Sequence, residues 1–394
     1  IAGIITETGG TTSHSAILAR ALEIPAVLSV EGVASSLKNG DTVVVDGSEG
    51  AVIVNPDDNT VAEYSKKRDA FLAERKELEN YRGRETKSAS GEAYELFCNI
   101  GKPEDAVKAV DADGEGVGLF RTEFLFMDRT SIPTEDEQFE AYKKAALILK
   151  GKSLIIRTLD IGGDKDIPYL GLEKEENPFM GFRAIRYCLK NRELFKSQIK
   201  AILRASAFGD IKIMFPLITT MDELREGKKL VAECKADLRN MGINFNENIQ
   251  VGVMVETASA AVIADMLAKE ADFFSIGTND LTGYTMACDR GNNDVSYLYS
   301  PLQPSVLRMI KRTIECGVQN GISVGMCGEA AANKLMIPLL ISFGLTEFSV
   351  SAPSVLNVRK IISTWTKEEA DKVTAKVLEM STQQEIVEYL KSVV

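Results

Sequence analysis

Eight short apolar segments, separated by amphipathic stretches with helical spacing, occupy the chain from Tyr94 onward. Such an alternation predicts an α/β fold with a parallel sheet, and eight units are the number that a closed (β/α)8 TIM barrel requires. Capping-box patterns at Thr134 with Glu137 and at Thr366 with Glu369 mark two of the expected helix starts. In chain order, the segments read ELFCNI, GVGLFRTEF, SLIIRTLD, IKIMFPLI, VGVMVET, FFSIGTND, SVGMCGE and FSVSA.

The residues before the barrel predict a small domain and a helix. Strand-like runs such as PAVLSV and TVVVDG alternate with a helical piece, which is typical of a small α/β domain. A charged stretch then carries Tyr64, Phe71 and Leu78 at roughly helical spacing, so we expect a connecting helix. Because the chain begins at Ile1 within an apolar run, we expect the first portion of the small domain to be missing. The predicted domains are a partial small α/β domain at 1–56, a linker helix and connector at 57–92, and the barrel at 93–394.

The amino-acid composition limits the size of the core and the kinds of molecule that the protein can bind. With 45% apolar residues among 394, the chain can bury one large core and one smaller core. A net charge of −11 argues against nucleic acid, because phosphate backbones bind basic surfaces. No apolar run approaches the roughly 20 residues that span a bilayer, and no signal-peptide pattern is present, so we expect a cytoplasmic protein. The six cysteines have no paired spacing, which is typical of reduced thiols.

His14 is the only histidine of the chain and lies in the segment GGTTSHSAILAR. Two glycines permit a tight turn, Thr12 or Ser13 can cap a helix, and strong helix formers follow, so we expect His14 in the first helical turn. At that position the helix dipole favours a neutral imidazole and an anion bound beside it. These conditions suit a histidine that accepts a phosphoryl group. A structural histidine in a turn is the alternative for this residue type considered alone.

This segment resembles the phosphohistidine signature of the phosphoenolpyruvate-utilising enzymes. That family includes enzyme I of the sugar phosphotransferase system, pyruvate phosphate dikinase and phosphoenolpyruvate synthase. The resemblance implies that His14 takes the phosphoryl group of phosphoenolpyruvate and that pyruvate is released.

Polar side chains follow the predicted strands at their C-terminal ends, where the catalytic groups of TIM barrels gather. Arginine grips phosphate or carboxylate through two parallel hydrogen bonds, so three arginines at one barrel mouth predict a small polyanion such as phosphoenolpyruvate. For any single arginine, the alternative is an ion pair with a carboxylate of a neighbouring loop. The polar residues at strand ends or in the loops that follow are Arg121, Arg157, Glu256, Asn279, Asp280, Arg290 and Cys327.

Two acids and a thiol among these residues suggest specific chemistry. Since the barrel segments contain no histidine, Glu256 and Asp280 predict an all-oxygen site for Mg²⁺ or Mn²⁺, which would neutralise charge on the phosphoryl group. Either acid alone is equally compatible with a salt bridge. Enolpyruvate must be protonated at carbon, and we assign that step to Cys327, which lies in GMCGE close to glycines. The other five cysteines are expected to be small core residues.

Seven further segments resemble enzyme I in order along the chain. They are RTEFLFMDR at 121–129, RTLDIGGDK at 157–165, NPFMGFRAIR at 177–186, VGVMVET at 251–257, FFSIGTNDL at 273–281, MACDRGN at 286–292 and SVGMCGE at 323–329. The resemblance implies Mg²⁺ binding by Glu256 and Asp280 and proton donation by Cys327. It also implies transfer onward to the phosphocarrier HPr, homodimerisation through the barrel, and a swing of the small domain about the connecting helix. The residues that it implies for phosphoenolpyruvate binding are Arg121, Arg157, Asn279, Asp280 and Arg290, with Arg183 and the GGDK loop nearby.

Three residues depart from the family pattern, and three alternatives stay open. Gly283 stands where a larger polar residue is expected, Ala258 where proline is usual, and Asn333 where aspartate is common, so we expect effects on rate. A nitrogen-branch enzyme I differs upstream of Ile1. A dikinase or synthase fragment would need a nucleotide-binding domain, which could also precede Ile1. A regulatory module that binds partners when phosphorylated, without efficient turnover, is favoured only by Gly283.

Overall fold

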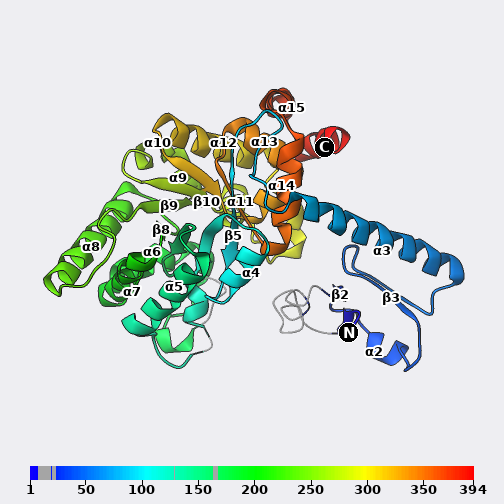
Figure 1. Cartoon of the computed structure of the whole chain (residues 1–394), viewed down its shortest axis with the longest axis horizontal. Helices are drawn as coiled ribbons and strands as arrows, with labels where there is room; N and C mark the ends of the chain where they lie inside the picture. Colours follow the sequence, from blue (N-terminus) through cyan, green and yellow to red (C-terminus); the bar gives the residue numbers. More distant parts are fainter. Residues whose placement is uncertain (8–18, 20–23, 128, 163–166) are drawn as a thin grey trace. The chain divides into compact units, whose positions relative to one another are not determined.

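The structure, a computed structural model, describes residues 1–7, 19, 24–127, 129–162 and 167–394 (Figure 1). The chain forms two compact units, Ile1–Asn80 and Tyr81–Val394. The domain boundaries predicted at residues 56 and 92 stay predictions. In the described part of the chain, no helix is both long enough and apolar enough to cross a membrane.

The first unit contains two small sheets and a long helix. β1 (Ile4–Ile5) pairs in parallel with β2 (Ala26–Val27), and β3 (Val43–Asp46) pairs antiparallel with β4 (Ala51–Val54). Helix α2 (Val33–Ser36) lies between the two pairs in the chain. Helix α3 (Asp58–Leu78) begins where the Asp57 side chain accepts a hydrogen bond from Thr60 N at 2.7 Å. It occupies the stretch predicted as the connecting helix, and none of its residues is buried.

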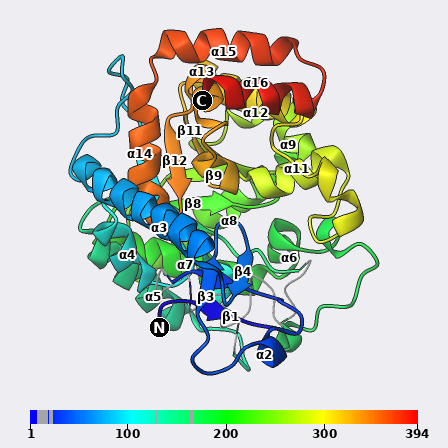
Figure 2. The ribbon, with the colours of Figure 1, turned by 90° about the vertical axis from the view of Figure 1, so that its right-hand side faces the viewer.

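The second unit is a closed barrel of eight parallel strands (Figures 1 and 2). Neighbouring strands follow chain order, and the last strand closes the barrel against the first. Each predicted apolar segment coincides with one strand, although the last strand begins one residue before FSVSA, so the predicted fold class is confirmed. The strands are β5 (Glu95–Ile100), β6 (Gly116–Arg121), β7 (Leu154–Arg157), β8 (Ile211–Phe215), β9 (Val251–Val255), β10 (Phe273–Ile276), β11 (Ser323–Met326) and β12 (Glu347–Val350).

Helices cover the outside of the barrel (Figure 2). Capping boxes start four of them, at Thr134 and Thr366 as predicted and also at Thr220 and Thr382. The helices are α4 (Asp105–Asp111), α5 (Glu135–Leu149), α6 (Ala184–Lys190), α7 (Arg192–Ala205), α8 (Met221–Asn240), α9 (Ala258–Val262), α10 (Ala264–Leu267), α11 (Thr278–Met286), α12 (Pro304–Gln319), α13 (Ile337–Phe343), α14 (Val355–Thr364), α15 (Lys367–Glu379) and α16 (Gln383–Val393).

The strands are apolar along most of their length because both of their faces are buried. Their outward side chains join those of the helices in one large core. Their inward side chains form a separate cluster that fills the barrel, as expected for a barrel of eight strands. This inner cluster consists of Leu119, Ile155, Met214, Met254, Phe273 and Cys327.

Candidate active site

The C-terminal end of the barrel gathers the predicted polar residues. Arg121 and Arg157 are the last residues of β6 and β7 and are register partners on these adjacent strands. Glu256 follows β9 directly, Asp280 lies in the first turn of α11 after β10, and Cys327 follows β11. Since all the strands are parallel, their C-terminal ends meet at one face. The barrel therefore brings these five predicted residues to the same end.

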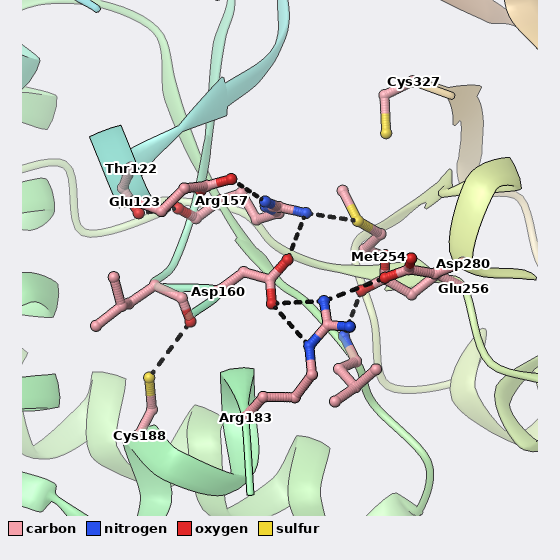
Figure 3. Close-up of polar contacts among 12 residues, drawn as sticks. Thr122, Glu123, Arg157, Asp160, Arg183, Cys188, Met254, Glu256, Asp280 and Cys327 are labelled. Atoms are coloured by element: carbon pink, nitrogen blue, oxygen red, sulfur yellow. Dashed lines mark hydrogen bonds and ion pairs between the residues drawn. The ribbon is translucent and has the colours of Figure 1, made fainter. Parts of the chain in front are cut away.

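Arg157 forms buried ion pairs with two acids. Its Nη2 donates to Glu123 Oε1 at 2.7 Å, and its Nη1 lies 3.0 Å from Asp160 Oδ2 (Figure 3). Burial by itself would lower the pKa of Arg157, but the nearby carboxylates of Glu123 and Asp160 raise it by more, so Arg157 stays a cation. Its buried Nε has no hydrogen-bond partner among the described residues. We did not predict Glu123 or Asp160, although both lie in the segments quoted above as RTEFLFMDR and RTLDIGGDK.

Arg183, which directly precedes α6, extends this ionic network. Its Nη2 donates to Asp160 Oδ1 at 2.8 Å and to Asp280 Oδ2 at 3.1 Å. Burial opposes its charge as well, but Asp160 and Asp280 raise the pKa of Arg183. Asp160 therefore bridges Arg157 and Arg183, and Arg183 links Asp160 to Asp280 (Figure 3).

Arg121 differs from these two arginines, because it has no acidic partner among the described residues. Its side chain makes no hydrogen bond or ion pair with another residue that the structure describes. It is only partly buried, whereas Arg157 is 7% exposed. The alternative predicted for each arginine, an ion pair with a nearby carboxylate, therefore holds for Arg157 and Arg183, whereas Arg121 has no such ion pair with any described residue.

Glu256 is a buried acid beside other acids. It is 2% exposed, and its Oε1 accepts a hydrogen bond from Leu217 N at 2.7 Å. Burial raises the pKa of Glu256 to about 8, and repulsion from Asp280 and Asp160 adds to the shift. Gly277 leaves room for it, because a Cβ there would lie 2.8 Å from Glu256 Oε2. Ionisation of Glu256 beside Asp280 is therefore unfavourable, and a bound cation would favour the ionised forms of both acids.

This donor set fits a hard divalent cation. Carboxylate oxygens are the ligands that Mg²⁺ and Mn²⁺ prefer, and Glu256 and Asp280 supply them from two neighbouring loops. Among the described residues, no group of three or more His, Cys, Asp or Glu side chains is arranged to hold a metal. A cation here would therefore complete its coordination with substrate and water oxygens, as Mg²⁺ often does.

Asn279 and Arg290 also lie near this mouth. Asn279 Oδ1 accepts a long hydrogen bond from Glu329 N at 3.4 Å, and its carbonyl accepts one from Tyr299 at 2.9 Å. The Arg290 guanidinium lies 5.7 Å from the centre of the Phe179 ring, and the Arg183 guanidinium lies 5.8 Å from the same centre. Phe179 therefore brings Arg290 close to the ionic network.

Cys327 lies at the top of the inner barrel cluster. It is 3% exposed, and its Sγ lies 3.8 Å from Ile276 O. Burial raises the pKa of the Cys327 thiol to about 11, so the thiol is protonated at neutral pH. Gly328 is required beside it, because a side chain at that position would collide with Thr278 Oγ1. A buried, protonated thiol at the mouth is suited to donating a proton.

The remaining predicted residues lie outside the described part of the chain or outside the ionic network. His14 and most of its predicted helix lie outside the described residues, as does most of the GGDK loop. Of the three departures from the family pattern, Ala258 begins α9 next to the capping residue Thr257. Gly283 lies within α11, where a Cβ would approach Cys288 O at 3.2 Å. Asn333 ends a short helical turn at 329–332.

Known protein families match nearly the whole chain. Residues 75–366 match the PEP-binding domain of PEP-utilising enzymes, and residues 1–50 match their mobile domain. A phosphoenolpyruvate-protein phosphotransferase of Bacillus subtilis is 51% identical over 391 residues, which cover 99% of this chain and 69% of the relative. The protein of the same name from Staphylococcus carnosus is 48% identical over 391 residues, covering 99% of this chain and 68% of the relative.

Proposed function

Because this chain belongs to the family of phosphoenolpyruvate-utilising enzymes, we propose that it transfers the phosphoryl group of phosphoenolpyruvate to its own His14 and then to a carrier protein. Its relatives are named phosphoenolpyruvate-protein phosphotransferases, which favours this transferase over a dikinase or synthase fragment. The proposed carrier is HPr of the sugar phosphotransferase system. The proposed assembly is a homodimer through the barrel.

One observation carries the substrate proposal. Among the residues that the structure describes, two donors at the barrel mouth have no partner, the Arg121 guanidinium and the buried Arg157 Nε. A buried donor left unpaired, such as Arg157 Nε, is costly, so it points to a ligand that completes it and that also reaches Arg121. A phosphate or carboxylate accepts from both arginines at once, and phosphoenolpyruvate carries both groups.

The two acids have a distinct proposed role. Glu256 and Asp280 would hold Mg²⁺, and the bound cation would supply neutralisation of the charge on the phosphoryl group and the enolate. Arg183 holds Asp280 Oδ2 at 3.1 Å and so fixes the orientation of that carboxylate. Asp160 fixes Arg157 and Arg183 relative to each other.

The thiol completes the proposed reaction. His14 takes the phosphoryl group in line, and the arginines hold its oxygens in place. The enolate carbon then takes the Sγ proton of Cys327, which is available because its pKa lies near 11. Pyruvate leaves, and the small domain carries phosphohistidine to the carrier. We propose α3 as the hinge of that movement.

Labelling tests this function directly. We expect incubation of the full chain with ³²P-phosphoenolpyruvate and Mg²⁺ to give one acid-labile phosphate, which mass spectrometry maps to His14. The His14→Ala variant should take up none while binding phosphoenolpyruvate normally. Phosphate on another residue, or labelling that persists in the variant, would contradict the assignment.

A further inference from the structure

Glu347 is a buried acid that has no role in the reaction described above. It is the first residue of β12 and is 6% exposed, yet its Oε1 makes no hydrogen bond with any residue that the structure describes. Burial raises the pKa of Glu347 to about 8, Glu95 adds to the shift, and Lys212 opposes it. A carboxyl group in this environment carries a proton at neutral pH.

Glycines on two other strands make room for this carboxyl group. A Cβ on Gly325 of β11 would lie 2.9 Å from both Cδ and Oε1 of Glu347. A Cβ on Gly118 of β6 would collide with the same Oε1 and would lie 2.5 Å from Ser349 Oγ. The carboxyl group therefore lies over Gly325, inside the barrel.

The strand pairing at Gly325 also shows where Glu347 lies relative to Cys327. Ser275 on β10 and Glu347 on β12 are both register partners of Gly325. β11 separates these two strands, but the Glu347 carboxyl group lies over Gly325 of β11, and neighbouring strands are roughly 4.8 Å apart. Because neither Glu347 Oε1 nor Ser275 Oγ has a hydrogen-bond partner among the described residues, the two groups need one water molecule to link them. Cys327 follows Gly325 by two residues and so faces the same side.

Ser275 provides the link to the thiol. It is fully buried, and its Oγ completes no hydrogen bond of standard geometry among the described residues. Burial is the main influence on the Cys327 thiol, but hydrogen bonding to the Ser275 hydroxyl partly offsets the rise in its pKa. The hydroxyl is therefore close to the sulfur and has bonding capacity to spare.

We propose that Glu347 is the proton reservoir that reloads Cys327 through the Ser275 hydroxyl. The proposal rests on the proposed role of Cys327 as the proton donor. After the enolate carbon has taken the Sγ proton, the thiolate takes the proton of Ser275, Ser275 takes one from the linking water, and that water takes the proton of Glu347. The Glu347 carboxylate then regains one proton from solvent at the N-terminal end of the barrel, where Glu95 is exposed. Each pyruvate therefore consumes one solvent proton.

Hydrogen exchange on pyruvate tests this relay. The full chain with Mg²⁺ and pyruvate is placed in D₂O, and ¹H NMR follows loss of the methyl signal. Cys327 removes a methyl proton in the reverse of donation, but deuterium enters only if the relay exchanges that proton with solvent. We expect Glu347→Gln to slow exchange by roughly tenfold or more, because the amide has the same shape but carries no acidic proton.

A conservative variant separates a relay from a packing role. Glu347→Asp leaves a gap but keeps an acidic proton, so it should exchange faster than Glu347→Gln. If Glu347 only filled space, the isosteric glutamine would be the better replacement. Faster exchange in Glu347→Gln than in Glu347→Asp would therefore overturn the proposal.

Two more variants complete the test. Ser275→Ala should slow exchange as much as Glu347→Gln does. If circular dichroism shows that the Glu347 variants have not folded, the exchange rate of Ser275→Ala alone tests the relay. Thr374→Val on α15, which also removes a buried hydroxyl without a partner, should exchange as the wild type does. If Cys327→Ala abolishes exchange but the Ser275 and Glu347 variants match the wild type, the relay is wrong and the donor role stands. If Cys327→Ala exchanges normally, both are wrong.

Discussion

Asp160 accepts a hydrogen bond from Arg183 Nη2 at 2.8 Å, and its second oxygen lies 3.0 Å from Arg157 Nη1. One buried carboxylate thus positions two arginines at the barrel mouth. Because all three side chains are less than a tenth exposed, little water screens these contacts. The geometry of the site depends on this acid although it is not itself expected to contact the substrate.

Replacing Asp160 by asparagine should therefore weaken both stability and binding. Breaking a buried ion pair on one side costs about 3–5 kcal/mol, so we expect a clear fall in Tm and weaker phosphoenolpyruvate binding by calorimetry. Asp265→Asn is the matched control, because Asp265 pairs with Arg312 at 2.8 Å where both side chains are about half exposed. That change should cost about 1 kcal/mol or less. Equal effects of the two substitutions would contradict the assigned role of Asp160.

Arg157→Lys should lower kcat/KM for phosphoenolpyruvate sharply. A single lysine ammonium group cannot pair with Glu123 and Asp160 and also donate a hydrogen bond to the substrate oxygen that Arg157 Nε would bind. About 2–5 kcal/mol of transition-state binding should therefore be lost. Steady-state kinetics with the carrier protein measures this loss. Arg225→Lys, at an exposed pair with Glu270, should leave the kinetics unchanged. Wild-type kinetics in the Arg157 variant would show that this arginine does not bind the substrate.

Stability without metal should fall as the pH rises toward 8 and above. The pKa values of Glu256 and Glu347 are raised in the folded protein to about 8 from an ordinary value of 4.5. The folded state thus favours their protonated forms, whose stabilising contribution is complete below about pH 4.5 and is lost as the pH rises through about 8.

Thermal unfolding in EDTA at pH 5.5 to 9 checks this dependence. Glu256→Gln and Glu347→Gln should each flatten the decline of Tm with pH. Mg²⁺ should restore Tm at high pH in the wild type but not in Glu256→Gln. A decline that is equally steep in both variants would show that other groups cause it.

Cys327→Ala should slow pyruvate formation by about 10²-fold or more, the usual contribution of a positioned proton donor. A lactate dehydrogenase assay under single-turnover conditions measures the rate, with phosphorylation of the protein followed in parallel. Cys234→Ala, which removes a buried thiol from α8, is the control. Pyruvate formation at the wild-type rate in Cys327→Ala would transfer the donor role to another group.

The barrel was predictable because its signal is local. Strands buried on both faces are continuous apolar runs, and five of the eight runs ended in polar residues that the proposed site uses. Capping boxes at Thr134 and Thr366 are equally local. The boxes at Thr220 and Thr382 carry the same signal, a threonine three residues before a glutamate, and could have been found in the same way.

Asp160, Glu123 and Glu347 were not predictable from local patterns. Two partners of Asp160, Arg157 and Arg183, are three and 23 residues away in the chain, and Arg183 meets it only in the folded barrel. Glu347 precedes the apolar run FSVSA and resembles a solvent-exposed residue at a strand start. It is buried because Gly118 and Gly325, on two other strands, leave space for its carboxyl group. Such contacts depend on register between strands that are distant in the sequence.

A crystal structure of the full chain with phosphoenolpyruvate and Mn²⁺ tests the proposed site most directly. We expect an anomalous peak between the carboxylates of Glu256 and Asp280, and phosphate or carboxylate oxygens within hydrogen-bonding distance of Arg157 Nε and the Arg121 guanidinium. A Mn²⁺ peak elsewhere, or a substrate that contacts neither arginine, would contradict the proposed site.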